Sequence, residues 1–389
     1  MKKILVVFGT RPEAIKLSPV IQQLKRKPAD FQVKICVTAQ HREMLDQVLK
    51  IFKIVPDYDL NIMKPGQDLF EVTGSCLAGI KKVLKKEKPH LVIVQGDTAT
   101  AFIVALAAFY FKVPIAHVEA GLRTHNKYSP FPEEVNRRLI SVLADYHFAP
   151  TESSRCNLLR EGVSVSKIWV TGNTVVDALL SIKDKHRGRV NKTAWIKYFK
   201  KHYNLNLQED RKIILVTGHR RESFGEGFRN ICFALKEIAG RRKDAVIIYP
   251  VHLNPHVQLP VKNILGSIKN IRLIRPLEYE PFVFLMQSAY LILTDSGGIQ
   301  EEAPSLGKPV LVMRQVTERP EGVKAGMVKL VGTDKNLIVK ETLRYLENKV
   351  LYKRAVNSAN PYGNGKASAK IREILSRTPA PGVGLQAAV

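Results

Sequence analysis

Glycines and charged residues follow a short apolar run in the second half of the chain, within the segment Thr294–Pro304 (TDSGGIQEEAP). The run before it is β-prone and predicts a buried strand, and Ile299–Leu306 is expected to form a short helix. Gly297 and Gly298 lie between the two, where they let the backbone approach a ligand closely. A helix that starts here directs free N–H groups and the positive end of its dipole at an anion. We therefore predict a phosphate site at this turn.

The same pattern could arise from a turn that needs glycine only for its shape, and Asp295 or Ser296 could simply cap the helix. The charged residues farther along the chain favour a binding site, because packing after a strand does not need so many of them. They are Glu301, Glu302, Lys308, Arg314, Glu318, Arg319 and Glu321.

Carboxylates form a second group of candidate residues, in the first half of the chain. Asp97 comes soon after the predicted buried strand Leu91–Val94, and Glu119 directly follows the predicted strand Pro114–Val118. In an open parallel sheet, ligands bind at the carboxyl ends of the strands. Glu133 opens a predicted helix, where it could instead complement the helix dipole. Carboxylates gathered at one sheet edge shift one another's pKa, which suits acid–base chemistry.

The first element of the chain is an apolar strand, Ile4–Phe8, followed by a turn at Gly9 and a helix over about residues 14–25. This order is typical of nucleotide-binding α/β folds, although the GxGxxG fingerprint is missing. Arg11 and Lys16 lie at the start of the helix. They could meet an anion, or they could be ordinary surface cations.

Strand-like and helix-like segments alternate along most of the chain, which at 389 residues is too long for one ordinary core. A charged, irregular stretch at about residues 181–210 interrupts the alternation, and only Ala194–His202 within it predicts a short helix. We predict an α/β protein with two Rossmann-like, doubly wound domains facing a cleft, at residues 1–180 and 205–365, and a disordered tail at 378–389. The diphosphate of a nucleotide fits the phosphate site, and a reacting sugar fits the carboxylates.

The composition bounds the class of protein. Its hydrophobic content of 45% is typical of a globular chain, and no apolar run reaches the roughly 18 residues that a membrane span needs. The first residues show no signal-peptide pattern. Four cysteines lie far apart in apolar segments, which predicts buried free thiols in a reducing cytoplasm. They are Cys36, Cys76, Cys156 and Cys232.

The net charge is strongly positive, +26, from 61 Lys+Arg and 35 Asp+Glu. Such a charge is typical of nucleic-acid binding proteins. The lysines are nevertheless scattered over predicted helix faces, as at Lys81–Lys82 and Lys200–Lys201, without interleaved aromatic residues. A basic solvated surface, or a field that steers an anionic small molecule, explains them as well. We therefore expect no nucleic-acid partner.

Several long motifs, in this order, resemble those of the non-hydrolysing UDP-N-acetylglucosamine 2-epimerases. The resemblance runs from about residue 3 to residue 376 and rests on Phe8–Lys16, Gln95–Thr98, His117–Thr124, Pro132–Arg137, Gly218–Glu222, Thr294–Val310 and Thr317–Gly322.

The resemblance implies the GT-B fold, in which a C-terminal helix, here about residues 366–377, returns to the first domain, and we expect a cytoplasmic homodimer. It implies interconversion of UDP-N-acetylglucosamine and UDP-N-acetylmannosamine for cell-surface polysaccharide precursors. UDP is eliminated with the proton of sugar carbon 2 to give 2-acetamidoglucal, and then re-adds. No metal or redox cofactor is required.

Residue roles follow by the same resemblance. The carboxylates that act on the two faces of carbon 2 are matched by Asp97, Glu119 and Glu133. Which of them acts on which face stays open. His219 and Arg11 would stabilise the departing diphosphate. The remaining substrate-binding positions cover the phosphates, the ribose and the uracil: Lys16, Ser296, Gly297, Gly298, Glu302, Arg319, Leu277 and Phe282.

A second, activating UDP-N-acetylglucosamine site in bacterial relatives is matched by Gln40, Gln67 and His252. Gly66 stands where some relatives have Arg, which removes a phosphate partner. Three alternatives to the non-hydrolysing epimerase remain: a hydrolysing epimerase that releases N-acetylmannosamine, a GT-B glycosyltransferase, and a nucleotide-sugar or nucleic-acid binding protein without catalysis.

Overall fold

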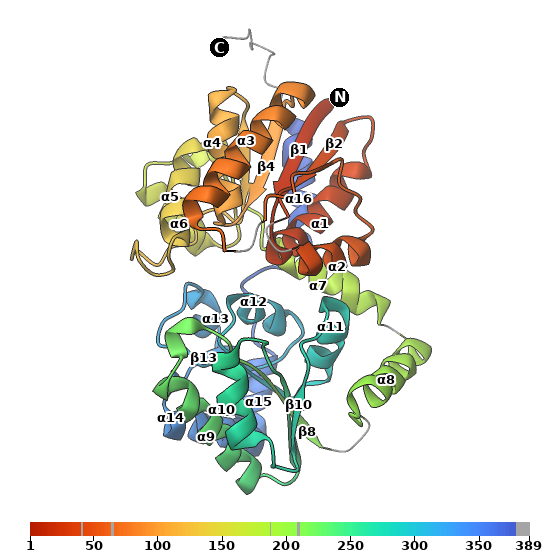
Figure 1. Cartoon of the computed structure of the whole chain (residues 1–389), viewed down its shortest axis with the longest axis vertical. Coiled ribbons are helices and arrows are strands. Elements are labelled where there is room, and N and C mark those ends of the chain that lie inside the picture. Colours follow the sequence, from red (N-terminus) through yellow and green to blue (C-terminus); the bar gives the residue numbers. More distant parts are fainter. Residues whose placement is uncertain (40–41, 64–65, 187, 208–210, 379–389) are drawn as a thin grey trace. The chain divides into compact units, whose positions relative to one another are not determined.

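The computed structural model describes residues 1–39, 42–63, 66–186, 188–207 and 211–378. Gln40 and nearly all of the predicted tail, residues 379–389, therefore lie outside the described residues. The chain divides into two units (Figure 1). The first comprises Met1–Ala178 with the segment from Tyr362, and the second comprises Leu179–Pro361.

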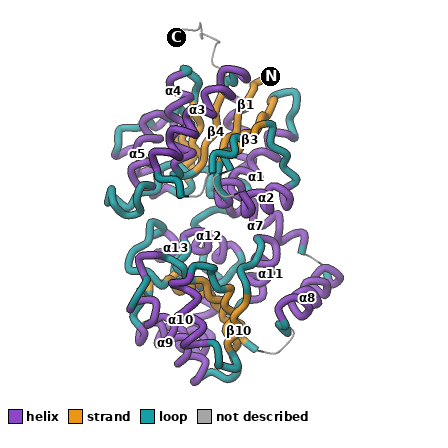
Figure 2. The backbone as a smooth tube through the Cα atoms, in the orientation of Figure 1, coloured by secondary structure: helices purple, strands orange, loops and turns teal. Residues whose placement is uncertain are grey.

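The first unit has a seven-stranded parallel sheet in the order β3-β2-β1-β4-β5-β6-β7. Helices lie along the strands (Figure 2), and this cover explains why β1 and β4 are almost entirely apolar. The strands are β1 (Lys2–Phe8), β2 (Phe31–Val37), β3 (Tyr58–Asp59), β4 (Leu91–Gln95), β5 (Ile115–Val118), β6 (Tyr146–Ala149) and β7 (Ile168–Val170). The helices are α1 (Arg11–Lys25), α2 (Arg42–Phe52), α3 (Leu69–Glu87), α4 (Ala99–Tyr110), α5 (Glu133–Leu143), α6 (Glu152–Arg160) and α16 (Ala367–Arg377).

The second unit has a six-stranded parallel sheet in the order β10-β9-β8-β11-β12-β13. Its strands are β8 (Lys212–Thr217), β9 (Ala245–Pro250), β10 (Ile271–Ile274), β11 (Leu291–Thr294), β12 (Val310–Val312) and β13 (Val328–Leu330). Its helices are α8 (Arg189–Tyr203), α9 (Glu226–Arg241), α10 (Pro255–Leu265), α11 (Tyr279–Ser288), α12 (Gly297–Ser305), α13 (Pro320–Lys324), α14 (Lys335–Glu347) and α15 (Lys349–Val356), and α7 (Thr174–Lys185) spans the boundary between the units. Both sheets follow the Rossmann strand order, so the predicted α/β class of two doubly wound domains is confirmed.

The stretch 181–210 was predicted to be largely irregular, but its described residues, 181–186 and 188–207, are mostly helical, so that prediction was wrong. Helix α7 continues to Lys185, and α8 has 15 residues where a shorter helix was expected. The cause is tertiary: Trp195 and Phe199 of α8 stack on Phe284 of α11 at ring-centroid distances of 5.7 and 5.9 Å. Burial of this aromatic face stabilises a helix whose sequence alone looks merely charged.

Two smaller expectations concerned the cysteines and membrane-spanning segments. Three of the cysteines are buried as predicted, but Cys156 is exposed, because it lies on the outer side of α6. Within the described residues, no helix is both long enough and apolar enough to cross a membrane.

The C-terminal helix α16 belongs to the first unit. Asp177 of α7 accepts hydrogen bonds from the backbone N–H groups of Ala367 and Ser368, at 3.2 and 2.8 Å, and from the Ser368 hydroxyl. This carboxylate therefore satisfies N–H groups at the start of α16 that have no partner within the helix. The Arg372 side chain of α16 also donates to the Gln23 side chain of α1 at 3.0 Å.

Candidate active site

In each unit the strand order reverses between two neighbouring strands, β1 and β4 in the first unit and β8 and β11 in the second. Open parallel sheets bind ligands beyond the carboxyl ends of the strands at such a point. The predicted residues cluster there: Arg11 and Asp97 come shortly after β1 and β4, and His219 and Ser296 come shortly after β8 and β11. Each unit thus carries one group of candidate residues at its own switch point.

The predicted phosphate site is the N-terminus of α12. Ser296 is the N-cap residue, and among the described residues no side chain caps the helix. The proposed cap by Asp295 was wrong, because its Oδ2 accepts the backbone N–H groups of His219 and Arg220 at 2.6 and 2.7 Å. Asp295 therefore joins the loops after β11 and β8, and the first N–H groups of α12 keep their capacity to bind an anion.

The two glycines of α12 differ in the space around them. A Cβ on Gly297 would lie 2.6 Å from Nη1 of Arg319, whereas a Cβ on Gly298 would meet nothing within 4 Å. Neither glycine is among the residues with positive φ. Gly297 is therefore needed for the approach of Arg319, and Gly298 faces open space at the helix start.

Acidic residues hold Arg319 in place. Its Nε lies 2.6 Å from Glu301 and its Nη1 lies 3.0 Å from Glu318, which also pairs with Arg314. Burial acts to raise the pKa of Glu318, but the charges of Arg319 and Arg314 outweigh it and hold this pKa well below its usual range. The network places a fixed guanidinium beside the N-terminus of α12.

The predicted ribose and uracil residues lie on α12 and at the start of α11. The Tyr279 hydroxyl donates to Oε1 of Glu302 at 2.7 Å, so Glu302 is oriented from the first turn of α11. Leu277 is buried just before this helix, and Phe282 is half-buried within it. The structure therefore joins Glu302 to the α11 segment that carries Leu277 and Phe282.

His219 lies in the loop after β8, and its ring stacks on the ring of His252 with centroids 5.1 Å apart and planes 11° apart. Burial, together with the neighbouring His219, lowers the pKa of His252. The Tyr249 hydroxyl donates to the Gly218 carbonyl at 2.9 Å and so fixes the turn that presents His219. A predicted catalytic residue and a predicted activator-site residue are thus in direct contact.

In the first unit, Glu119 is held by several donors. Its Oε1 accepts Lys16 Nζ at 2.5 Å and Asn173 Nδ2 at 2.9 Å, and its Oε2 accepts the Gln95 side chain. The backbone of Glu119 is left-handed, with φ of 67°, a rare conformation for a residue with a side chain. Lys16 and Glu119 thus form a buried ion pair, a contact that the sequence did not predict.

Asp97 stands on a tight turn, because the preceding Gly96 has φ of 72°. Its Oδ2 accepts a hydrogen bond from Nε of Arg137 at 2.8 Å and lies 2.7 Å from Nη2 of the same side chain, and its carbonyl accepts Nδ2 of Asn136 at 2.9 Å. The Asp97 side chain is 26% exposed. This carboxylate is therefore both fixed and accessible.

Glu13 is a functional candidate that sequence reasoning missed. Its Oε2 accepts the backbone N–H groups of Gly9 and Thr10, at 3.1 and 2.8 Å, and its Oε1 accepts the Thr98 hydroxyl at 2.8 Å. Burial raises the pKa of Glu13, and these hydrogen bonds oppose the rise. Glu13 joins the turn before Arg11 to the turn that carries Asp97. Its spacing from Thr10 indicates only a capping box, so the sequence offers no signal for the longer contact.

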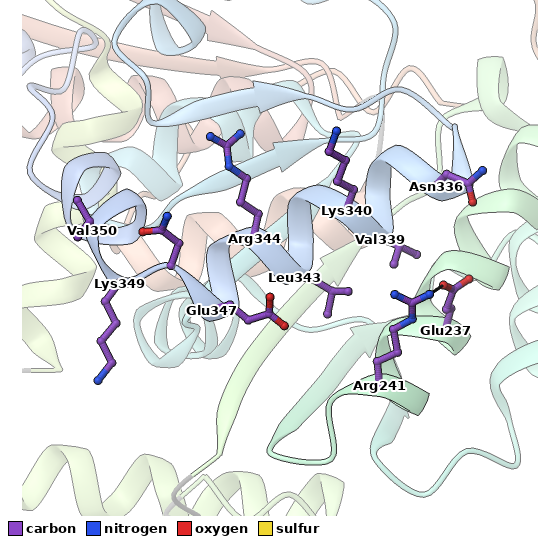
Figure 3. A pocket seen from close by; sticks show the side chains of 11 residues that line it. Glu237, Arg241, Asn336, Val339, Lys340, Leu343, Arg344, Glu347, Lys349 and Val350 are labelled. Atoms are coloured by element: carbon purple, nitrogen blue, oxygen red, sulfur yellow. Dashed lines mark ion pairs between the residues drawn. The ribbon is translucent and has the colours of Figure 1, made fainter.

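The other predicted residues lie farther from these contacts. Glu133 is the first residue of α5, half-buried, and the contacts to Asp97 come from later residues of that helix. The Gln67 side chain donates to the Ile62 carbonyl at 3.0 Å, and Gly66 is exposed with φ of 78°. A groove on the second unit, between α9, α14 and α15, holds none of the predicted residues (Figure 3).

Two buried histidines lie side by side under the first site, His117 on β5 and His147 on β6. Burial lowers the pKa of each to about 4. In an unfolded chain, the pKa of histidine is about 6.5. Because the folded pKa values are depressed, the folded state takes up protons on these two rings less readily than the unfolded chain does. The free energy of unfolding is therefore undiminished by these histidines above about pH 6.5, and it decreases as the pH falls towards about 4.

We therefore expect the melting temperature to fall less in a His147→Gln variant than in the wild type when the pH is lowered from about 7 to about 5. Calorimetry at the two pH values measures this. An exposed histidine of the same unit, His125, provides the control variant His125→Gln, whose pH dependence should match the wild type. If the melting temperature depended on pH equally in the wild type and in His147→Gln, the lowered pKa of His147 would be contradicted.

A family model and a relative found by sequence comparison carry the same description. A family model described as UDP-N-acetylglucosamine 2-epimerase matches residues 22–376. The UDP-N-acetylglucosamine 2-epimerase of Escherichia coli (strain K12) is 58% identical over 373 residues, which are 96% of this chain and 98% of that protein.

Solved structures are similar over the same length. The crystal structure of UDP-GlcNAc 2-epimerase from Neisseria meningitidis bound to UDP-GlcNAc has a TM-score of 0.91 and 51% identity, covering 97% of this chain and 100% of that one. The Methanocaldococcus jannaschii enzyme in complex with UDP-GlcNAc and UDP has a TM-score of 0.81 and 38% identity, covering 97% and 100%. With the two Rossmann-like sheets, these likenesses confirm the predicted GT-B fold class.

Proposed function

Because the chain belongs to the UDP-N-acetylglucosamine 2-epimerase family, we propose that it interconverts UDP-N-acetylglucosamine and UDP-N-acetylmannosamine by releasing and re-adding UDP, without hydrolysis. The observation that carries the proposal is the pair of switch-point groups. One offers an uncapped helix N-terminus beside Arg319 for a diphosphate, and the other offers carboxylates for carbon 2. The reaction supplies UDP-linked mannosamine for cell-surface polysaccharide precursors.

The first step needs a base for the weakly acidic proton of carbon 2 and a stabilised leaving group. Asp97 takes this proton, the electron pair forms the double bond between carbons 1 and 2, and the bond from carbon 1 to the diphosphate oxygen breaks. The N–H groups at the start of α12, with Arg319, Arg11 and His219, receive the negative charge that develops on UDP. The products are 2-acetamidoglucal and UDP.

The second step reverses the first on the other face of the sugar. A protonated group delivers a proton to carbon 2, and UDP adds back to carbon 1, so that no atom is gained or lost overall. Glu133, at the start of α5, and Glu119 are the further carboxylates of the first unit. Since Glu119 is buried and held by three side-chain donors, whereas Glu133 is only half-buried, we assign the second proton transfer to Glu133.

The stacked pair of His219 and His252 supports a further part of the proposal, an activating site for a second UDP-N-acetylglucosamine at Gln40, Gln67 and His252. A ligand that moves His252 would move the ring against which His219 rests. A His252→Ala variant should therefore respond less to added UDP-N-acetylglucosamine in a rate assay that starts from UDP-N-acetylmannosamine, and an unchanged response would argue against this site.

We also propose that the enzyme works in the cytoplasm, with UDP and UDP-N-acetylglucosamine as its ligands, and as a homodimer. Apolar side chains are exposed on the C-terminal turns of α4 and α5, which pack against each other: Phe109, Tyr110, Leu139 and Val142. Val142 is 84% exposed. Exposed apolar side chains on two helices that pack together fit a protein partner, here a second copy of the chain.

A Val142→Glu variant is accordingly expected to shift sedimentation from dimer to monomer, because an unpaired charge would enter an apolar interface. Val350, 78% exposed on α15 of the other unit, gives the matched control Val350→Glu. A dimer in both variants, or a wild-type monomer, would remove this part of the proposal.

The experiment for the activity uses the protein with UDP-N-acetylglucosamine alone, and NMR of the products. We expect the UDP-linked mannosamine epimer and no accumulation of free sugar. Free N-acetylmannosamine with UDP would instead identify the hydrolysing type, and an unchanged substrate would leave a transferase that lacks its acceptor or a binding protein.

A further inference from the structure

Helix α5 holds Asp97 at two separate points. Arg137 directs two nitrogens, Nε at 2.8 Å and Nη2 at 2.7 Å, at the same carboxylate oxygen, Oδ2. The neighbouring residue on the same helix, Asn136, donates to the Asp97 carbonyl at 2.9 Å. Among the described residues, no side chain donates to the other oxygen, Oδ1. One oxygen of the carboxylate is thus occupied, and the other remains available to a substrate.

Arg137 is itself held from behind. Its Nη1 donates to Oε2 of Glu134 at 2.9 Å, and the Glu134 side chain is fully buried. Glu134 also accepts the backbone N–H groups of Thr124 and His125, each at 3.0 Å. The loop after β5 therefore fixes Glu134, Glu134 fixes Arg137, and Arg137 fixes the carboxylate of Asp97.

The backbone of the same turn is also held by a residue of β5. The ring Nε2 of His117 lies 2.7 Å from the Gly96 carbonyl. A carbonyl only accepts hydrogen bonds, so Nε2 carries the proton, and the low pKa of this buried ring keeps it in the neutral form. Asp97 consequently has few ways to rotate or shift, even though its side chain is partly exposed.

We propose that Arg137 is a positioning residue for the proton transfer by Asp97: its Nε and Nη2 both contact Oδ2, which turns Oδ1 towards carbon 2 of the substrate. The inference rests on the proposed function, in which Asp97 is the base. A planar guanidinium can direct two nitrogens at one oxygen in a fixed plane, whereas a lysine offers one mobile ammonium. The charge alone is therefore not sufficient for this role.

The test is Arg137→Lys in the full chain, which keeps the positive charge next to Glu134 and Asp97. We expect kcat to fall by about 100-fold, the loss that a misplaced catalytic group produces. KM and the affinity for UDP should stay within about threefold of the wild-type values, because Arg137 does not bind the substrate in this account. In an Asp97→Asn background, Arg137→Lys should lower the residual rate no further.

Arg138 is the matched control, because it is the next residue on α5 and its side chain is 47% exposed. Arg138→Lys should retain the wild-type kcat. If Arg137→Lys fails to fold, the double variant Glu134→Gln/Arg137→Gln removes both charges of the buried pair, leaves the Asp97 carboxylate partly exposed to solvent, and should show the same loss of kcat.

Two results would overturn the inference. One is a kcat within about threefold of wild type in Arg137→Lys, far less than misplacement of the base would cost. The other is a further loss of rate in the Asp97→Asn background. A wild-type protein that forms no epimer would refute the proposed function and the inference together, whereas an active wild type with an active Arg137→Lys would refute the inference alone.

Discussion

An Asp97→Asn variant is expected to bind UDP as the wild type does and to lose epimerisation by a factor of about 100 to 10,000, the range that general acid–base catalysis contributes. The amide has nearly the shape of the carboxylate and can still accept Arg137 at one oxygen, so the turn should persist. Only the capacity to take up a proton is lost. Initial rates by NMR and UDP affinity by calorimetry measure the two effects separately.

Glu119→Gln is the instructive comparison. Glu119 lies in a buried ion pair with Lys16 at 2.5 Å, so removal of its charge breaks this buried pair. We expect a lower melting temperature in Glu119→Gln as well as a lower rate, whereas Asp97→Asn should melt close to the wild type. Equal melting temperatures with equal losses of rate would indicate that both carboxylates transfer protons.

The second large effect is expected at the start of α12, where Gly298→Val should weaken UDP binding by at least about 100-fold while the protein remains folded. A Cβ at Gly298 meets nothing within 4 Å, so the free protein has room for it. The branched side chain would fill the space that the phosphate oxygens need. Each hydrogen bond to a charged group that is lost costs about 1.5–3 kcal/mol, or about 10- to 100-fold in affinity.

Calorimetry of a graded series tests this expectation. Gly298→Ala should lose less UDP affinity than Gly298→Val. Gly240→Val, at an equally open position in α9, should keep the wild-type affinity. Glu302→Gln should weaken UDP but not free diphosphate, since only the ribose has lost its acceptor. Unchanged UDP affinity in Gly298→Val would mean that the glycine turn is purely structural.

The sequence predicted the parts of the site that depend on local pattern. Buried parallel strands are continuous apolar runs, so their carboxyl ends, and with them Asp97, Glu119 and Gly298, could be placed from residue types alone. The glycine turn before a helix likewise has a local physical cause. Both expectations needed no knowledge of which strands are neighbours.

Contacts between distant segments could not be predicted in this way. Arg137 and Asp97 are 40 residues apart, and no local pattern in the sequence links them. Asp295, one residue before the N-cap Ser296, could act as a cap judged by the sequence, but the loop after β8 offers it two N–H groups instead. Helix α8 appeared short because its charged residues conceal an aromatic face that packs on Phe284. Each of these outcomes depends on a tertiary partner that leaves no periodic signal.

The most direct test of the central claim is the reaction of wild-type protein with UDP-N-acetylglucosamine in deuterium oxide, followed by NMR of carbon 2. Elimination and re-addition remove the original proton and return one from solvent, so the UDP-N-acetylmannosamine formed should carry deuterium at carbon 2, as should the UDP-N-acetylglucosamine re-formed from it. An epimer that retains its original hydrogen at carbon 2 would contradict the proposed mechanism.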